Sequence, residues 1–215
     1  MSKLKKISAL LLSGALALGF VSTFLGGGTQ IGGSTSNSAE VKHQFIGESQ
    51  TALNQQNGKV LMFFWYGCPH CYHVHKEIEN HNEMERYTFV AVPGNDLWTL
   101  HARHYYTMKE MGLLPSLDSK FFELVYSEHS KPTDEQINAF LTKNGVSLAE
   151  YQKVFISDQV KNDLEQARAM TARYNVTGTP SIFIDGNKPV VLGAASSYAD
   201  IVERIKAYYA TSPIN

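Results

Sequence analysis

The sequence predicts an α/β fold in which a block of helices interrupts a set of strands. An apolar run at 60–66, a helical pattern at 69–81 and a second apolar run at 87–92 form a strand–helix–strand unit, which implies a parallel pair of strands. Residues 96–156 then show helical spacing of apolar side chains and no convincing strand. Two further strands are expected within 182–192, followed by a final amphipathic helix.

The helical block is expected to hold several short helices joined by turns. A first helix ends at Gly112, and a second follows Pro115. Thr133 and Ser147 each open a capping box and start two shorter helices. The methionine and aromatic stripes on these helices are interpreted as core.

The C-terminal part is expected to return to the sheet. Ser157 caps a long helix that ends near Tyr174. The Asp-Gly pair at 185–186 predicts a hairpin turn after a short strand, and 189–192 are expected to form the antiparallel return strand. Ser197 then caps the final helix.

The N-terminal residues 1–25 have the features of a targeting segment. Three lysines precede an almost wholly apolar or small stretch at 7–25, which predicts export across a bacterial-type inner membrane or a eukaryotic equivalent. The stretch is close to the roughly 20 residues that span a bilayer, so a cleaved signal peptide and an uncleaved anchor both stay open. Residues 26–40 are rich in Gly, Ser and Thr and are interpreted as a flexible linker. Residues 41–46 are a weak candidate for a strand.

The composition of the 215-residue chain limits its class. The net charge is −1, so the composition does not suggest that the chain binds a nucleic acid. Hydrophobic residues make up 43% of the chain, which is ample for one core. We expect a monomer.

The two cysteines of the chain follow the first apolar run, as Cys68-Pro69-His70-Cys71. Pro69 suits the first position of a helix, where its missing N–H leaves no bond unmade. Cys68 is therefore expected at the helix N-cap. Free backbone N–H groups and the helix dipole favour a thiolate there, so the pKa of Cys68 should fall below the free value of about 8.5. A protonated His70 would add to this effect.

Three interpretations of this cysteine pair differ in kind. A structural disulfide across so short a loop would constrain the unfolded chain very little, so a dithiol that cycles between oxidised and reduced forms explains the pair better. A metal site would use His70, His73 and His75, yet zinc would need a second ligand pair, and no other cysteine is present. His101 and His104 make a mixed site conceivable, although a solvated helix face is the simpler interpretation.

A second informative position is Pro180, which follows Thr179 and directly precedes an expected strand. It is either an ordinary proline at the start of a strand or a proline in the cis form. In the cis form, the Thr179 backbone could lie against the sulfurs and pair with an extended substrate chain.

These motifs together resemble the thioredoxin superfamily, with the Cys-Pro-His-Cys at 68–71 after a strand and the Thr-Pro at 179–180 before one. The helical block resembles that of the DsbA family of periplasmic disulfide oxidases. Cys-Pro-His-Cys is typical of that family, and the Phe-Trp-Tyr-Gly at 64–67 and Tyr72 are also similar. The resemblance covers roughly residues 41–210.

The resemblance implies an α/β thioredoxin-like fold with an inserted helical domain. The first half of the thioredoxin-like domain, a βαβ unit, would span 41–95. The helical domain would span 96–156, and the second, ββα half would span 157–215.

The resemblance also implies a role for each matched residue. The catalytic residues would be the four at positions 68–71, Cys-Pro-His-Cys. Cys68 would be the exposed nucleophile, Cys71 the buried resolving sulfur, and His70 would stabilise the Cys68 thiolate. Thr179 and a cis Pro180 would hold the backbone of the substrate.

One position departs from the family pattern. Many members carry a buried glutamate six residues before the nucleophile, and this chain has Met62 there. Proton handling beneath the active site therefore does not carry over from the family. We expect Cys68 to rely more on the helix N-terminus and on His70.

The implied activity is that of a thiol:disulfide oxidoreductase without a resident cofactor or metal. It would donate its disulfide to unfolded or partly folded exported proteins with free thiols in the periplasm. A membrane partner of the DsbB kind, linked to quinone, would reoxidise it. The alternatives are a disulfide reductase or isomerase and a periplasmic metal- or peptide-binding chaperone. An isomerase is disfavoured, because isomerases of this superfamily usually add an N-terminal dimerisation domain, and here only the short stretch 26–59, interpreted mostly as linker, lies between the targeting segment and the active site.

Overall fold

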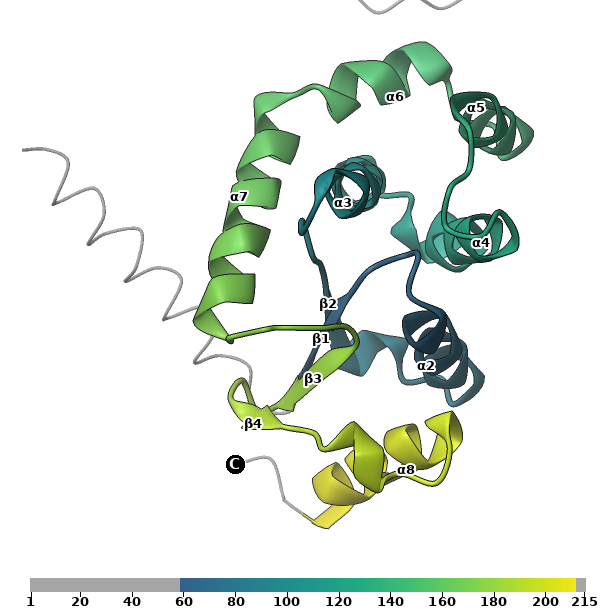
Figure 1. Cartoon of the computed structure of the whole chain (residues 1–215). Helices are drawn as coiled ribbons and strands as arrows, with labels where there is room; N and C mark the ends of the chain where they lie inside the picture. The colour runs from purple at the N-terminus through teal and green to yellow at the C-terminus, as the bar shows by residue number, and fades with distance from the viewer. Residues whose placement is uncertain (1–58, 212–215) are drawn as a thin grey trace, which may run out of the picture. The chain divides into compact units, whose positions relative to one another are not determined.

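The computed structural model describes residues 59–211, and the predicted targeting segment, linker and strand at 41–46 lie outside them. Figure 1 shows the elements along the chain. They are β1 (Val60–Phe64), α2 (Pro69–Asn80), η1 (Met84–Arg86), β2 (Tyr87–Ala91), α3 (Asp96–Glu110), α4 (Leu114–Ser127), α5 (Asp134–Lys143), α6 (Leu148–Phe155), α7 (Asp158–Arg173), β3 (Ser181–Ile184), β4 (Lys188–Pro189), η2 (Leu192–Ala194) and α8 (Tyr198–Thr211). Within the described part of the chain, no helix is long and apolar enough to cross a bilayer.

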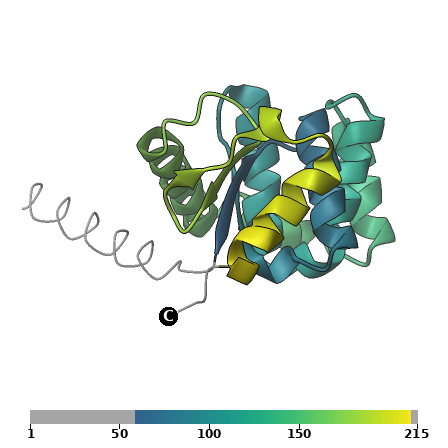
Figure 2. The same ribbon diagram turned by 90° about the horizontal axis from the view of Figure 1, so that it is seen from below.

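The sheet has the strand order β2-β1-β3-β4. β1 and β2 run parallel, and β3 lies antiparallel on the other side of β1. The predicted strand–helix–strand unit is therefore confirmed. α2 and α8 pack together on one face of this sheet, and α7 lies on the opposite face (Figures 1 and 2).

The hairpin after β3 differs from the prediction in its second strand. Asp185 and Gly186 both have positive φ values, 48° and 76°, as a type I′ turn requires. The return strand contains only Lys188 and Pro189, and the predicted strand at 189–192 is wrong in extent. Pro189 has no N–H to donate, so the ladder ends after one further bond, and the chain turns into η2.

The helices between β2 and β3 begin largely where the sequence predicted. Thr133 and Gln136 make both bonds of the capping box at the start of α5. Ser147 caps α6 through the Glu150 N–H at 3.4 Å, which is one of the two bonds of the predicted box. α4 starts slightly earlier than expected and holds Pro115 in its first turn, where a proline costs no hydrogen bond.

The core is built around β1, whose five residues are all fully buried. The Phe64 ring packs against the Tyr105 and Phe122 rings, with centroids 5.3 Å away in each case. Tyr105 comes from α3 and Phe122 from α4. The strand that leads into the two cysteines is therefore fixed by the sheet and by the helical block together.

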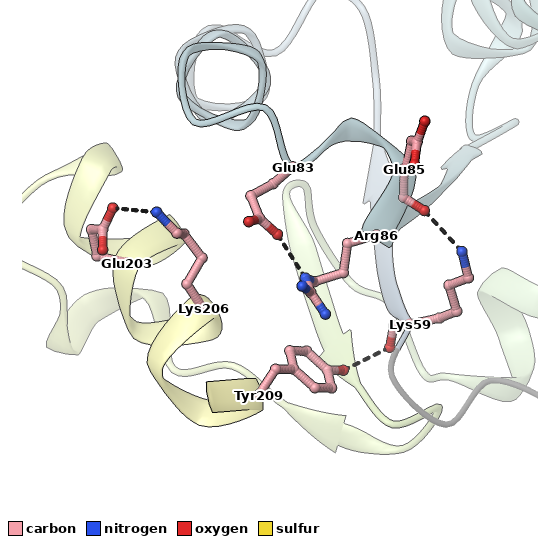
Figure 3. A network of polar contacts seen from close by, with 7 residues as sticks. All are labelled: Lys59, Glu83, Glu85, Arg86, Glu203, Lys206 and Tyr209. Atoms are coloured by element: carbon pink, nitrogen blue, oxygen red, sulfur yellow. Dashed lines mark hydrogen bonds and ion pairs between the residues drawn. The ribbon is translucent and has the colours of Figure 1, made fainter. Parts of the chain in front are cut away.

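A set of polar contacts fixes the N-terminal end of β1, at the far end of the strand from Phe64 (Figure 3). The Tyr209 hydroxyl of α8 donates to the Lys59 carbonyl at 2.9 Å. The Lys59 ammonium donates to the Glu85 carbonyl at 2.8 Å. Arg86 lies over the Tyr209 ring and pairs with Glu83. These contacts join the last helix to the start of the first strand.

Three buried polar side chains join α2 and the residues just before it to α4. The Tyr66 hydroxyl donates to Asp118 Oδ1, and His75 Nε2 lies 2.9 Å from Asp118 Oδ2. All three residues are at most 5% exposed. Burial, with the nearby Asp118 charge, raises the pKa of Tyr66 well above its usual value, so this hydroxyl stays a donor. The Asp118 carboxylate is the shared acceptor that holds both partners.

We predict that Asp118→Ala lowers the free energy of unfolding by about 3 kcal/mol, because it leaves two buried polar groups without their acceptor. Urea denaturation of the reduced protein measures the change. Glu123→Ala on the same helix is the matched control. Glu123 pairs with Lys76 at 3.0 Å, but both side chains are more than a third exposed, so the loss should stay under about 0.5 kcal/mol. Equal losses in the two variants would contradict the prediction.

Candidate active site

The two cysteines lie at the start of α2, as the sequence predicted. Cys68 is the N-cap residue with extended backbone angles, and Pro69 stands in the first turn. The Cys71 N–H donates to Cys68 Sγ at 3.3 Å, so the sulfur satisfies one of the free N–H groups of the helix end. Both cysteines are free thiols in this structure.

The surroundings of Cys68 favour its thiolate. The pKa of Cys68 is lowered to about 6, first by a hydrogen bond from the Cys71 thiol. Hydrogen bonds from the Thr179 side chain and from the Cys71 backbone lower it further, and the charge of His70 adds a smaller effect. Burial of the sulfur opposes these effects. At neutral pH the thiolate is therefore the main form of Cys68.

The second sulfur has the opposite preference. Cys71 is fully buried, whereas Cys68 is 7% exposed. Burial raises the pKa of Cys71 well above the usual range, and the neighbouring Cys68 sulfur adds to the increase. The pair thus combines one thiolate that a substrate sulfur can reach with one neutral thiol beneath it.

The Thr179–Pro180 peptide bond is cis, which settles the alternative that the sequence left open. The Cys68 sulfur lies 3.3 Å from the Thr179 carbonyl oxygen, although the two residues are 111 positions apart in the chain. Ser181 then begins β3. The loop before β3 therefore brings its backbone against the reactive sulfur.

His70 lies on the exposed side of the cysteine pair. Its Nδ1 atom is 2.7 Å from the Tyr198 hydroxyl at the start of α8. Sequence reasoning missed Tyr198. Ser197 marked the helix start correctly, since its hydroxyl accepts from the Asp200 N–H at 3.1 Å, but no local signal tells which helix the next residue will face.

A groove of about 580 Å³ opens beside His70. Its walls come from α2, the loop before β3, η2 and the start of α8. The lining residues are His70, Val74, Thr179, Pro180, Leu192, Gly193, Ala195, Ser196, Ser197, Tyr198 and Ile201. The predicted substrate-contacting residues Thr179 and Pro180 thus share one groove with the cysteine motif.

The two tryptophans of the chain lie next to the site. Trp65 stacks on Trp98 with ring centroids 4.7 Å apart, and its carbonyl accepts from the Cys68 N–H at 3.0 Å. A side chain at Gly67 would meet the Trp65 ring at 2.3 Å, so only glycine fits there. Tryptophan fluorescence should therefore respond to the redox state of the cysteines.

Met62 lies in the middle of β1 and is fully buried. It is paired with Phe89 and Ile182 on the neighbouring strands. The position that holds a glutamate in many family members is therefore apolar here and supplies no carboxylate beneath the cysteines.

The predicted solvated face with His101 and His104 is wrong, since these residues are 1% and 6% exposed. Burial lowers the pKa of His101 to about 4 and that of His104 to about 3, so both are neutral. His104 Nδ1 lies 2.9 Å from the Tyr151 hydroxyl. Across residues 59–211, no group of three His, Cys, Asp or Glu side chains is placed to hold a metal ion.

Comparison with known proteins agrees with this geometry. A family model described as a DSBA-like thioredoxin domain matches residues 86–206, a range that begins after the two cysteines. The thiol:disulfide interchange protein DsbA of Pseudomonas aeruginosa is 30% identical over 159 residues, covering 71% of this chain and 75% of that protein. DsbA of Azotobacter vinelandii is 28% identical over 175 residues, covering 78% of this chain and 82% of its own.

A solved structure shows the same fold. The crystal structure of Pseudomonas aeruginosa DsbA superimposes with a TM-score of 0.60 at 27% identity, over 71% of this chain and 85% of that one. The α/β thioredoxin-like fold with inserted helices is thereby confirmed. With its Cys68–Cys71 pair at the start of α2, the chain belongs to the DsbA family of thiol:disulfide oxidoreductases, within the thioredoxin superfamily.

Proposed function

We propose that this protein donates a Cys68–Cys71 disulfide to exported proteins and so forms disulfides during their folding in the periplasm. The observation that carries the proposal is the contrast between the two sulfurs. Stabilising the Cys68 thiolate stabilises the reduced protein, and this makes the disulfide form a stronger oxidant. A sulfur with a low pKa is also a good leaving group.

The reaction would proceed in two exchange steps. A substrate thiolate attacks Cys68 Sγ, a substrate–Cys68 disulfide forms, and the Cys68–Cys71 bond breaks. Cys71 leaves as a thiolate and takes up a proton, in keeping with its raised pKa. A second substrate thiolate then attacks the substrate sulfur of the mixed disulfide and releases the Cys68 thiolate. The substrate loses two electrons and the protein gains them.

The groove supports a site for the substrate chain. Thr179 and the cis Pro180 would hold the substrate backbone beside Cys68, because their backbone borders both the sulfur and the groove. His70 would stabilise the thiolate. These roles rest on the match of 68–71 and 179–180 to the family pattern together with the short contacts described above.

Family membership supports the remaining parts of the proposal. A membrane reoxidase of the DsbB kind would return the cysteines to the disulfide by passing electrons to quinone. The protein would act as a monomer in the periplasm, either released after cleavage near residue 25 or held by that segment. We also propose domain boundaries at 95/96 and 156/157, since α3–α6 fall between them.

We predict a reduction potential near the oxidising end of the range for known dithiol proteins, which runs from roughly −120 mV for DsbA to roughly −270 mV for thioredoxin. Equilibration with glutathione, followed by tryptophan fluorescence, measures it. Cys68→Ser is the control, because it cannot form the disulfide and its signal should not change. A potential near the thioredoxin end would overturn the proposal and favour a reductase.

We predict that the reactivity of Cys68 has its midpoint near pH 6. Because the pKa is lowered, the thiolate is present above this pH and is lost as the pH falls through it. Alkylation rates of the reduced protein and thiolate absorbance measure the midpoint. Cys71→Ala should raise it, since the Cys71 thiol is the largest stabilising contact. A wild-type midpoint near the free value of about 8.5 would contradict the prediction.

We predict that His70→Ala raises the pKa of Cys68 by less than about one unit, because the charge of His70 is the smallest of the favourable effects. The same thiolate titration measures the shift. Lys76→Ala removes a positive charge from the same helix, one that pairs with Glu123 rather than with the cysteine motif, and is the control. An unchanged midpoint in His70→Ala would rule out a role for this side chain.

A further inference from the structure

Tyr198 contacts the cysteine motif from a distant part of the chain. It is the first residue of α8, 128 positions after His70, and its hydroxyl lies 2.7 Å from His70 Nδ1. α8 packs against α2 (Figure 2). The hydroxyl therefore reaches the one side chain of the motif that carries a titratable ring.

The ring of Tyr198 is held by contacts that do not involve its hydroxyl. It stacks on the His73 ring with centroids 5.1 Å apart and planes inclined by 20°. The His73 ring in turn meets the edge of Tyr126 at 5.8 Å. Ile201, one turn further along α8, is buried against the core. Removing the hydroxyl should therefore leave the ring in place.

The contact can form in either protonation state of His70. When His70 is neutral, the phenol donates to the Nδ1 lone pair. When His70 is protonated, Nδ1–H donates to the phenol oxygen, and this charge-assisted bond is the stronger of the two. The contact thus fixes the orientation of the His70 ring in both states.

We propose that Tyr198 is a positioning residue that holds the His70 ring beside Cys68, thereby strengthening the disulfide as an oxidant. This inference rests on the proposed function. It is supported by the charge of His70, which stabilises the Cys68 thiolate.

The titratable groups on or next to α2 and α8 include His73, the two cysteines and Asp200. His73 stacks on Tyr198, and the two cysteine sulfurs face the site from the start of α2. Asp200 on α8 is engaged by Arg204 at 2.9 Å and by the Ser196 N–H at 2.8 Å. Among residues 59–211, no carboxylate forms an ion pair with His70.

The test is Tyr198→Phe in the full chain, which keeps the ring and removes the hydroxyl. We expect the equilibrium constant for reduction of the Cys68–Cys71 disulfide by glutathione to fall about two- to fivefold. The thiolate midpoint of Cys68 should rise by about 0.3–0.7 pH units. Tyr208→Phe on the same helix is the matched control. The Tyr208 hydroxyl bonds Asp185 at 2.6 Å, away from the cysteines, so both readouts should match the wild type.

A second variant separates positioning from a structural effect. If Tyr198 acts through His70, then adding Tyr198→Phe to His70→Ala should change neither readout further. Wild-type values for Tyr198→Phe alone, or an equal shift in the His70→Ala background, would overturn the inference. The comparison is between variants and does not depend on the absolute potential. A wild-type potential near that of thioredoxin would instead overturn the proposed function.

Discussion

The rest of the active site depends on the N-terminus of α2 and on the strand that fixes it. β1 is buried along its whole length, and Gly67 lets the chain turn tightly against the Trp65 ring. Pro69 then starts the helix, so Cys68 caps it and its sulfur accepts a backbone N–H. Because the sulfur occupies a place that normally takes a capping oxygen, the helix end and the thiolate stabilise each other.

Burial turns this arrangement into a pair with two different sulfurs. One helical turn separates Cys68, which is 7% exposed, from Cys71, which is fully buried. The same hydrogen bond that stabilises the Cys68 thiolate keeps the proton on Cys71. The asymmetry needs no cofactor, since it follows from the position of each sulfur relative to the helix end and to solvent.

The position before the cysteines where many family members carry a glutamate is apolar in this chain. Met62 makes the central strand wholly apolar, while the buried polar cluster of Tyr66, His75 and Asp118 lies between α2 and α4. A carboxylate with two hydrogen-bonded partners is stable in such a place, whereas one beneath the sulfurs would oppose the thiolate. The helical block therefore anchors the active-site helix through a polar contact as well as through packing.

The sequence by itself determined the features that depend on near neighbours. Helix caps at Cys68, Thr133 and Ser157, the parallel strand pair and the hairpin turn were all predicted correctly, because each follows from a few adjacent residues. The motifs also gave the family and the nature of the cysteine chemistry.

Only the tertiary structure decided which distant residues meet. The contacts of His70 with Tyr198 and of Cys68 with Thr179 join positions more than 100 residues apart. The burial of His101 and the short return strand depended on what packs against them. Such contacts leave no local pattern, because the partner is chosen by the packing of whole helices and strands.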